Sequence, residues 1–210
     1  MRNFAIDGKS ISVFSAVQTE APIIYLNTFA NEGQRVFEVA QVVGCPPFSL
    51  VAISSLDWNR DMAPWDSPAA FKKGEPFTGG ADDYLRLLVE EIIQEAEKEL
   101  LGPPAWRGIA GYSLAGLFAL CAVYQTDVFS QVGCMSGSLW FPGFKEYVFF
   151  HDLRHTFATV ALQSGVDVKT VSAMLGHYDA GLTLRTYTHT NRRMQEKAAE
   201  KMGNFMAQVL

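Results

Sequence analysis

Apolar and polar positions alternate along the first two thirds of the chain in a way that predicts strands and helices in turn. Short apolar runs bounded by turn residues predict buried strands at 11–16, 22–27, 48–54, 106–112 and 131–136. Apolar residues at helical spacing predict helices at 34–43, 81–100 and 114–124. Because strands that alternate with helices are typical of a parallel sheet, we expect an α/β fold with a mostly parallel sheet and helices on both faces.

The pattern changes at two places. The irregular stretch 57–80 carries tryptophans, prolines and Gly79-Gly80, and an ordered loop of this length usually has a function. Beyond about residue 147 the alternation gives way to helical patterns at 151–163, 168–175 and 191–209, separated by glycines. We therefore expect a first domain of residues 1–147 and an all-helical C-terminal segment, 148–210.

Charge divides the chain at the same place. Residues 1–147 have a net charge of −7, whereas residues 148–210 have a net charge of +2 and contain all four histidines. This basic excess is too small to require nucleic acid as a partner, and no apolar run is long enough to cross a bilayer. The N-terminus shows no signal peptide, and the cysteines lack metal-ligand spacing. We expect a cytoplasmic protein that needs no metal or cofactor and keeps three buried, reduced thiols: Cys45, Cys121 and Cys134.

A serine lies where one predicted strand ends and the next helix begins, in Gly111-Tyr112-Ser113-Leu114-Ala115-Gly116. Small residues around a serine at such a sharp turn are typical of a nucleophile elbow, although Ala115 takes the second small position, which is usually glycine. The backbone N–H of Leu114 would be one donor to an oxyanion. The second would come from Thr28 or Phe29, which follow an earlier strand.

Residues 108–120, followed by Met135-Ser136-Gly137-Ser138-Leu139-Trp140, resemble the esterase branch of the α/β-hydrolase superfamily, which includes esterases that act on ferric siderophores. The resemblance covers nearly all of residues 1–147 and implies a truncated α/β-hydrolase with acyl transfer through Ser113. It also implies a substrate cleft lined by Trp58, Trp65 and Trp140, with ordinary core packing as the alternative. The superfamily's acid and histidine follow the serine, yet residues 1–147 contain no histidine.

The C-terminal segment resembles a different family. The string His151-Asp152-Leu153-Arg154-His155-Thr156-Phe157, then Gly176-His177 and Thr186-Tyr187-Thr188, resembles the last part of a phage-integrase type tyrosine recombinase over about 149–207. The resemblance implies that His151 and Arg154 contact a scissile phosphate, that His177 assists, and that Tyr187 attacks phosphorus. The family's first arginine, its lysine and its DNA-embracing domain would lie upstream, so we do not expect DNA strand exchange.

Three functional hypotheses follow. The first is a serine esterase that acts on a small-molecule ester and takes its base from the C-terminal segment. His189 is favoured over His177 because it precedes the final predicted helix, and the candidate acids are Asp152, Asp167 and Asp179. The second is a catalytically impaired fusion product that forms a homo-oligomer through the exposed edge of strand 131–136 or through the helical tail. The third is a DNA-binding remnant, against which the acidic first part argues.

Overall fold

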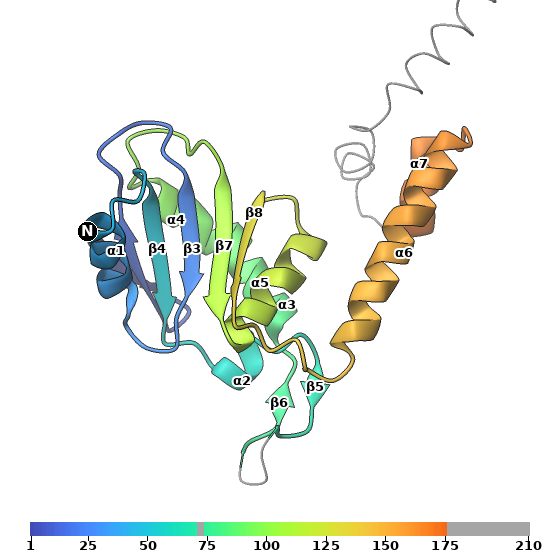
Figure 1. Ribbon diagram of the computed structural model, residues 1–210, viewed down its shortest axis with the longest axis horizontal. Coiled ribbons are helices and arrows are strands. Elements are labelled where there is room, and N and C mark those ends of the chain that lie inside the picture. Colours follow the sequence, from blue (N-terminus) through green and yellow to red (C-terminus); the bar gives the residue numbers. More distant parts are fainter. Residues whose placement is uncertain (71–73, 176–210) are drawn as a thin grey trace, which may run out of the picture. The chain divides into compact units, whose positions relative to one another are not determined.

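The computed structural model describes residues 1–70 and 74–175; within the latter, the side chains of 150–156, 159 and 163 are outside that description. The chain divides into two units, Met1–Pro142 and Gly143–Leu210, and the junction expected at 147 lies inside a helix of the second. The elements of the first unit (Figure 1) are β1 (Arg2–Ile6), β2 (Lys9–Phe14), β3 (Ile23–Asn27), α1 (Gly33–Val42), β4 (Ser49–Ser54), α2 (Trp58–Asp61), β5 (Asp66–Ser67), β6 (Phe77–Thr78), α3 (Ala81–Leu87), the π-helix η1 (Leu88–Ile92), α4 (Ile93–Glu97), β7 (Arg107–Tyr112), α5 (Leu114–Gln125) and β8 (Gln131–Met135). The second unit contains α6 (Phe144–Gln163) and α7 (Val168–Leu175).

A six-stranded sheet in the order β1-β2-β4-β3-β7-β8 forms the centre of the first unit. Neighbouring strands in the series β4, β3, β7 and β8 pair in parallel, whereas β2 is antiparallel to both β4 and β1. The sheet is therefore mixed, with its parallel part where the alternating pattern predicts it. The sequence did not indicate β1, because this edge strand has no fully buried position that would give an apolar signal.

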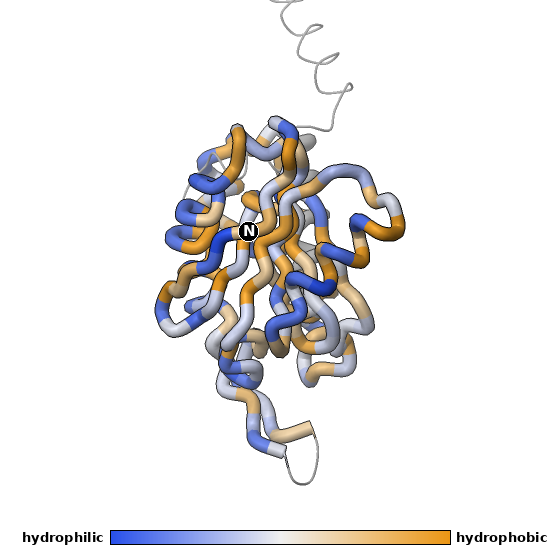
Figure 2. The backbone as a smooth tube through the Cα atoms, turned by 90° about the vertical axis from the view of Figure 1, so that its left-hand side faces the viewer, coloured by the Kyte–Doolittle hydropathy of each residue, from blue (hydrophilic) through white to orange (hydrophobic). Residues whose placement is uncertain are grey.

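The two faces of the sheet are covered by different helices. On one face Phe14, Leu26, Leu50 and Ala52 pack with Phe37 of α1, and a Cβ on Gly33 would lie 2.2 Å from the Ala52 Cβ, so α1 begins in direct contact with β4. On the other face Tyr25 and Asn27 contact Phe129 and Tyr84. Figure 2 shows hydrophobic stretches through the middle of this unit and hydrophilic stretches on its outside. Helices on both faces fix the ends of the parallel strands, where the candidate site lies.

One long helix predicted at 81–100 is α3, η1 and α4 in succession. Its buried residues Leu88, Ile92 and Ala96 follow one another at four-residue intervals across the π-helical turn. At its end the Glu97 carboxylate accepts hydrogen bonds from Arg107 Nε at 2.6 Å and Tyr25 Oη at 2.9 Å. Burial, followed by the nearby Glu97 charge, raises the pKa of Tyr25. This contact ties the end of the helix to β3 and β7, the two strands that lead into the candidate site.

The described part of the second unit is a helical hairpin. Ala158 and Leu162 of α6 pack on Val171 and Leu175 of α7. Gly165, with φ 89°, ends the first helix, because Gly165 N donates to the Leu162 carbonyl and Val166 N to the Ala161 carbonyl. The helices predicted at 151–163 and 168–175 are present, and α6 begins earlier, at Phe144. The helix predicted at 191–209 lies outside the described residues.

Two expectations from the sequence concern the chain as a whole. Among the described helices, none is long and apolar enough to cross a membrane. All three cysteines are free, but only Cys121 is fully buried, and Cys134 is partly buried. The prediction of a buried thiol is wrong for Cys45, which is exposed because it lies in the turn that follows α1, where Gly44 has φ 74°.

Candidate active site

Ser113 lies at the turn between β7 and α5 with φ 53° and ψ −121°. A non-glycine residue in this left-handed region stores about 1–3 kcal/mol of backbone strain, and such residues cluster at functional sites. Backbone hydrogen bonds hold the turn on both sides: Ser113 N donates to the Met135 carbonyl at 3.0 Å, and Ser138 N donates to the Ser113 carbonyl at 2.9 Å. The strand-to-helix turn inferred from the motif is therefore present, with the serine in a strained conformation.

The small residues around Ser113 are explained by close packing. A Cβ on Gly111 would lie 2.5 Å from the Ala115 carbonyl carbon and oxygen, so only glycine fits there without a shift. A Cβ on Gly116 would lie 3.1 Å from the Gly111 carbonyl oxygen and 3.2 Å from Cys134 Sγ. The methyl group of Ala115 faces a glycine, which accounts for alanine at the second small position of the motif.

The two candidate sources of oxyanion donors differ in how their N–H groups are used. Leu114 opens α5, and an N–H in the first turn of a helix has no intrahelical acceptor. Thr28 N donates to the Ile53 carbonyl at 2.9 Å, so this N–H is committed to the sheet. The backbone of Phe29, the next residue, is one of the groups that lower the pKa of Tyr112 at the end of β7. The geometry therefore favours Phe29 over Thr28 as the second donor, and this assignment stays a prediction.

A pocket of about 210 Å³ opens beside Ser113. Its lining consists of Trp58, Asn59, Ala70, Gly74, Glu75, Phe77, Ser113, Leu114, Ser138 and Trp140. Trp58 and Trp140 thus meet the serine in one cavity. Trp65 does not line it; its Nε1 donates to the Pro142 carbonyl at 2.7 Å and its ring packs edge-on against Phe141 at a centroid distance of 5.7 Å. Trp65 therefore holds the segment that carries Trp140.

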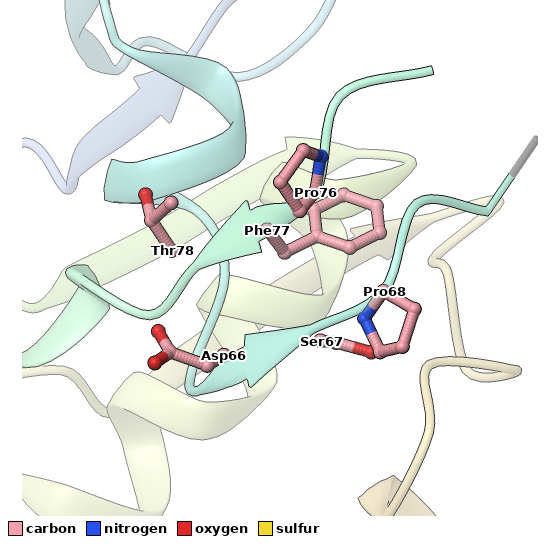
Figure 3. Close-up of a pocket in the computed structure, with 6 residues that line it drawn as sticks. All are labelled: Asp66, Ser67, Pro68, Pro76, Phe77 and Thr78. Carbon is pink, nitrogen blue, oxygen red and sulfur yellow. The ribbon is translucent and has the colours of Figure 1, made fainter. Parts of the chain in front are cut away.

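A larger hollow of about 620 Å³ lies at the β5–β6 hairpin (Figure 3). In this view Phe77 lies between Pro76 and Pro68, and the paired residues Asp66 and Thr78 lie at the other end of the hairpin. Its only serine, Ser67, lies in a short strand rather than at a strained turn. We place the candidate site at the smaller of these two pockets, because its Ser113 combines a strained backbone with the N–H groups at the start of a helix.

Aromatic rings and a hydrogen-bonded carboxylate position Trp58, which lines the pocket with Ser113. The Trp58 ring contacts Phe29 at 5.2 Å and Tyr112 at 5.8 Å between ring centroids, and Tyr112 Oη donates to Glu32 Oε1 at 3.5 Å. Burial, then the Glu32 charge, raises the pKa of Tyr112.

The helix that carries Trp58, α2, is held to the sheet by a buried ion pair. On α2 the Asp61 carboxylate pairs with Lys9 Nζ of β2 at 2.8 Å, and both side chains are buried. Tyr84 Oη, whose pKa burial raises, donates to Asn27 Oδ1 at the end of β3. These contacts tie α2 and α3 to the strand ends below the pocket.

The Ser113 hydroxyl has a partner that the sequence did not single out. Ser113 Oγ and Ser138 Oγ are 3.2 Å apart, and Ser138 is buried. The only signal in the sequence was the string Met135–Trp140, which carries Ser138 but does not show that it folds back onto the elbow. The side chains of all four histidines lie outside the described residues.

The remaining predicted site residues belong to the second unit. His177, Asp179, Tyr187 and His189 lie outside the described residues. Three more, His151, Asp152 and Arg154, belong to α6, where only the backbone is described. Asp167 caps α7: Thr170 N donates to its Oδ1 at 3.0 Å, and hydrogen bonds from Thr170 hold the pKa of this exposed carboxyl below its ordinary value. Within the described part of the chain, no cluster of side chains is suited to a metal ion.

Comparisons with known proteins find two different families of relatives, one of recombinases and one of hydrolases. Residues 135–194 match the model of the phage integrase family. A tyrosine recombinase XerC-like protein of Caldanaerobacter subterraneus subsp. tengcongensis is 40% identical over 55 residues, which are 26% of this chain and 14% of that protein. The chain therefore joins a fold similar to that of a serine hydrolase to a segment that matches this family model.

Solved structures of hydrolases are similar in fold to this chain. An IroE-like serine hydrolase from Shewanella oneidensis superposes with a TM-score of 0.56 and 22% identity over 70% of this chain and 51% of its own. The siderophore hydrolase EstA from Aspergillus nidulans superposes with a TM-score of 0.53 and 20% identity. The match covers 66% of this chain and 58% of EstA. The chain thus spans little more than half of these hydrolases and a seventh of the recombinase. Both resemblances drawn from the sequence are confirmed.

Proposed function

We propose that the first unit is a serine hydrolase of the carboxylesterase type with Ser113 as its nucleophile. The observation that carries this proposal is the strained backbone of Ser113, φ 53°, at a strand-to-helix turn where contact with Ala115 requires glycine at position 111. Strain of this kind persists only where the surrounding structure maintains it, and here it presents a hydroxyl beside a pocket. The hydrolase fold of the similar structures supports the same conclusion.

The proposed reaction is acyl transfer in two steps. Ser113 Oγ adds to the ester carbonyl carbon while a base takes its proton, and the N–H groups of Leu114 and Phe29 donate to the oxyanion. The C–O bond then breaks, the alcohol leaves with the proton, and the acyl group stays on Ser113. Water repeats the sequence to release the acid. The hydrogen bond to Ser138 orients the Ser113 hydroxyl before substrate arrives.

The base is the second part of the proposal. Residues 1–147 contain no histidine, so a histidine base within this chain must come from the C-terminal segment. We assign His189 first and His177 second, with Asp179 as the acid that orients the imidazole. Without such a base, a serine hydroxyl is a weak nucleophile near neutral pH.

Four variants test these assignments on p-nitrophenyl acetate and on a fluorophosphonate probe, which labels activated serines. We expect Ser113→Ala to abolish both signals. Replacing the histidine that acts as base with alanine is expected to lower both signals by about 10³-fold. Ser67→Ala, a buried serine outside the pocket, leaves both unchanged. An unchanged rate in Ser113→Ala would refute the esterase. Full labelling in both His177→Ala and His189→Ala would refute only the choice of base.

A second candidate is a catalytically impaired fusion product. It is favoured by one observation: in the first unit β8 is an edge strand, and its Val132 and Met135 side chains are 41% and 48% exposed. Exposed edges pair readily with another copy of the same strand. Sedimentation of the purified chain, together with turnover per monomer, distinguishes the two candidates: a dimer without fluorophosphonate labelling supports this one.

A further inference from the structure

The pocket beside Ser113 has an unusual combination of side chains. Three of the residues that line it are aromatic: Trp58, Phe77 and Trp140. Glu75 is its only ionisable residue among those that the structure describes, and no described lysine or arginine lines it. Lys72 and Lys73 lie outside the described residues. Aromatic faces and a carboxylate are the groups with which proteins bind organic cations.

The aromatic wall and the acidic residue are held together by one short helix. Asn59 follows Trp58 on α2, and its Nδ2 donates to the backbone carbonyls of Glu75 at 3.4 Å and Pro76 at 3.5 Å. The segment that carries Glu75 is thereby fixed to the helix that carries Trp58. The arrangement is a built feature of the pocket, because α2 is in turn held by the buried pair of Asp61 and Lys9.

A second carboxylate lies behind the same aromatic wall. Trp58 contacts the Tyr112 ring, and Tyr112 donates to Glu32, whose other oxygen accepts from Ala30 N at 3.1 Å. Residues 1–147 also carry the acidic net charge of −7. Among the described residues, Glu75, Glu32 and the net charge of residues 1–147 therefore favour a positively charged substrate over a strongly anionic one.

We propose that this pocket binds the cationic group of the substrate, so that the enzyme prefers esters carrying an alkylammonium group over neutral or anionic esters of the same size. This inference rests on the proposed function and names its substrate class. The ammonium group lies among Trp58, Trp140 and Glu75 while the ester carbonyl reaches Ser113. The chemistry at the carbonyl is unchanged: Ser113 acquires the acyl group and the alcohol leaves with a proton.

A pair of isosteric esters tests the preference directly. Butyrylcholine and 3,3-dimethylbutyl butyrate have the same shape and differ in one positive charge, and acid release follows both. We expect kcat/KM to be at least about 10-fold higher for butyrylcholine. Glu75→Gln lowers that ratio several-fold through KM of the cationic ester and leaves the neutral ester unchanged. Glu90→Gln, an exposed carboxylate on η1, makes the same change in net charge and leaves the ratio unaltered.

A binding measurement separates failure of this inference from failure of the esterase. In Ser113→Ala, which cannot turn over, choline is expected to change the tryptophan fluorescence in a saturable way, and Glu75→Gln in the same background weakens that binding. Saturable choline binding without hydrolysis of either ester would uphold the cation pocket and overturn the proposed function. Equal kcat/KM for the two esters, or choline binding that is insensitive to Glu75→Gln, would overturn the cation pocket while leaving the serine assignment intact.

Discussion

Two turns, one in each unit, reverse the chain at a residue with positive φ and use opposite residue types. The turn into α5 has Ser113 at φ 53°, and the turn after α6 has Gly165 at φ 89°. Glycine adopts this region without steric conflict, whereas serine pays about 1–3 kcal/mol of strain there. Gly165 lies in a hydrogen-bonded helix ending where an added Cβ would meet no atom within 4 Å, whereas the elbow is crowded.

Under the proposed function, the difference separates a position that serves stability from one that serves catalysis. The hairpin of the second unit is ended by the residue that best fits the backbone, so nothing about Gly165 requires chemistry. The first unit keeps a hydroxyl at a position where glycine is expected to be more stable. Its neighbours accommodate this choice, because Gly111 lacks the Cβ that would collide with Ala115 and Gly116 lacks one that would crowd Cys134. Substitutions at the two turns and at the start of α7 test this contrast.

The largest expected effect is at the crowded turn. Gly111→Ala places a methyl group about 2.5 Å from the backbone carbon and oxygen of Ala115, and backbone atoms cannot move aside as a side chain can. We expect the free energy of unfolding of the first unit to fall by about 3 kcal/mol. Urea unfolding followed by tryptophan fluorescence measures this, because all four tryptophans lie in the first unit.

Gly102→Ala is the matched control. A methyl group there meets only Thr19, with Cγ2 at 3.8 Å, so the free energy of unfolding changes by no more than about 0.5 kcal/mol. If the two variants are equally stable, the close packing around the elbow is not what selects glycine at 111.

The second prediction concerns the other turn. Gly165→Ala forces a Cβ into the left-handed region and is expected to destabilise the hairpin by about 1–2 kcal/mol. The loss shows in the helical circular dichroism signal, while tryptophan fluorescence, which reports on the first unit, keeps its midpoint. Ser164→Ala, at the preceding residue with φ −78°, serves as the control with little effect. A shift of the fluorescence midpoint by the same amount would show that the two units unfold together.

Much of the first unit could be predicted because its signals are local. The buried run Phe48–Ser54 predicts a strand from consecutive residues alone. The serine between Gly111 and Ala115 predicts a turn in the same way. The contacts that were missed come from distant segments: Ser138 reaches Ser113 across 25 positions, and Tyr84 reaches Asn27 across 57. The family resemblance implies a cleft position for Trp65, and a tryptophan in a long loop does not reveal that its indole N–H donates to the Pro142 carbonyl.

The third prediction is a gain in the free energy of unfolding, whereas the first two are losses. Ser113→Gly relieves the strain at the elbow, and Ser113→Ala removes the same hydroxyl but keeps the Cβ that causes the strain. The glycine variant is therefore expected to be more stable than the alanine variant by about 1 kcal/mol in urea unfolding, although both lack the nucleophile and neither hydrolyses ester. Equal stability of the two variants would mean that the elbow carries no strain that glycine can relieve.

The smallest effect is electrostatic and confined to the second unit. Hydrogen bonds from the Thr170 hydroxyl and N–H favour the charged form of Asp167, so its pKa is lower in the folded than in the unfolded state. A depressed pKa means that this contribution to stability is complete above the unfolded pKa of about 3.9 and is lost as pH falls through the folded value. The hairpin should therefore show no dependence on Asp167 between about pH 5 and pH 9 and a slight loss of helical signal only in stronger acid.

Asp167→Asn keeps a capping oxygen without a titrating proton, so comparing its acid titration with that of the parent isolates the carboxyl. An Asp167 that instead titrated above its ordinary pKa, read from its side-chain carbonyl resonance, would mean that the carboxylate is not held by the α7 cap. Such a result would return Asp167 to the candidate acids for the Ser113 site, because a carboxyl engaged by its own helix is already committed to stabilising the hairpin.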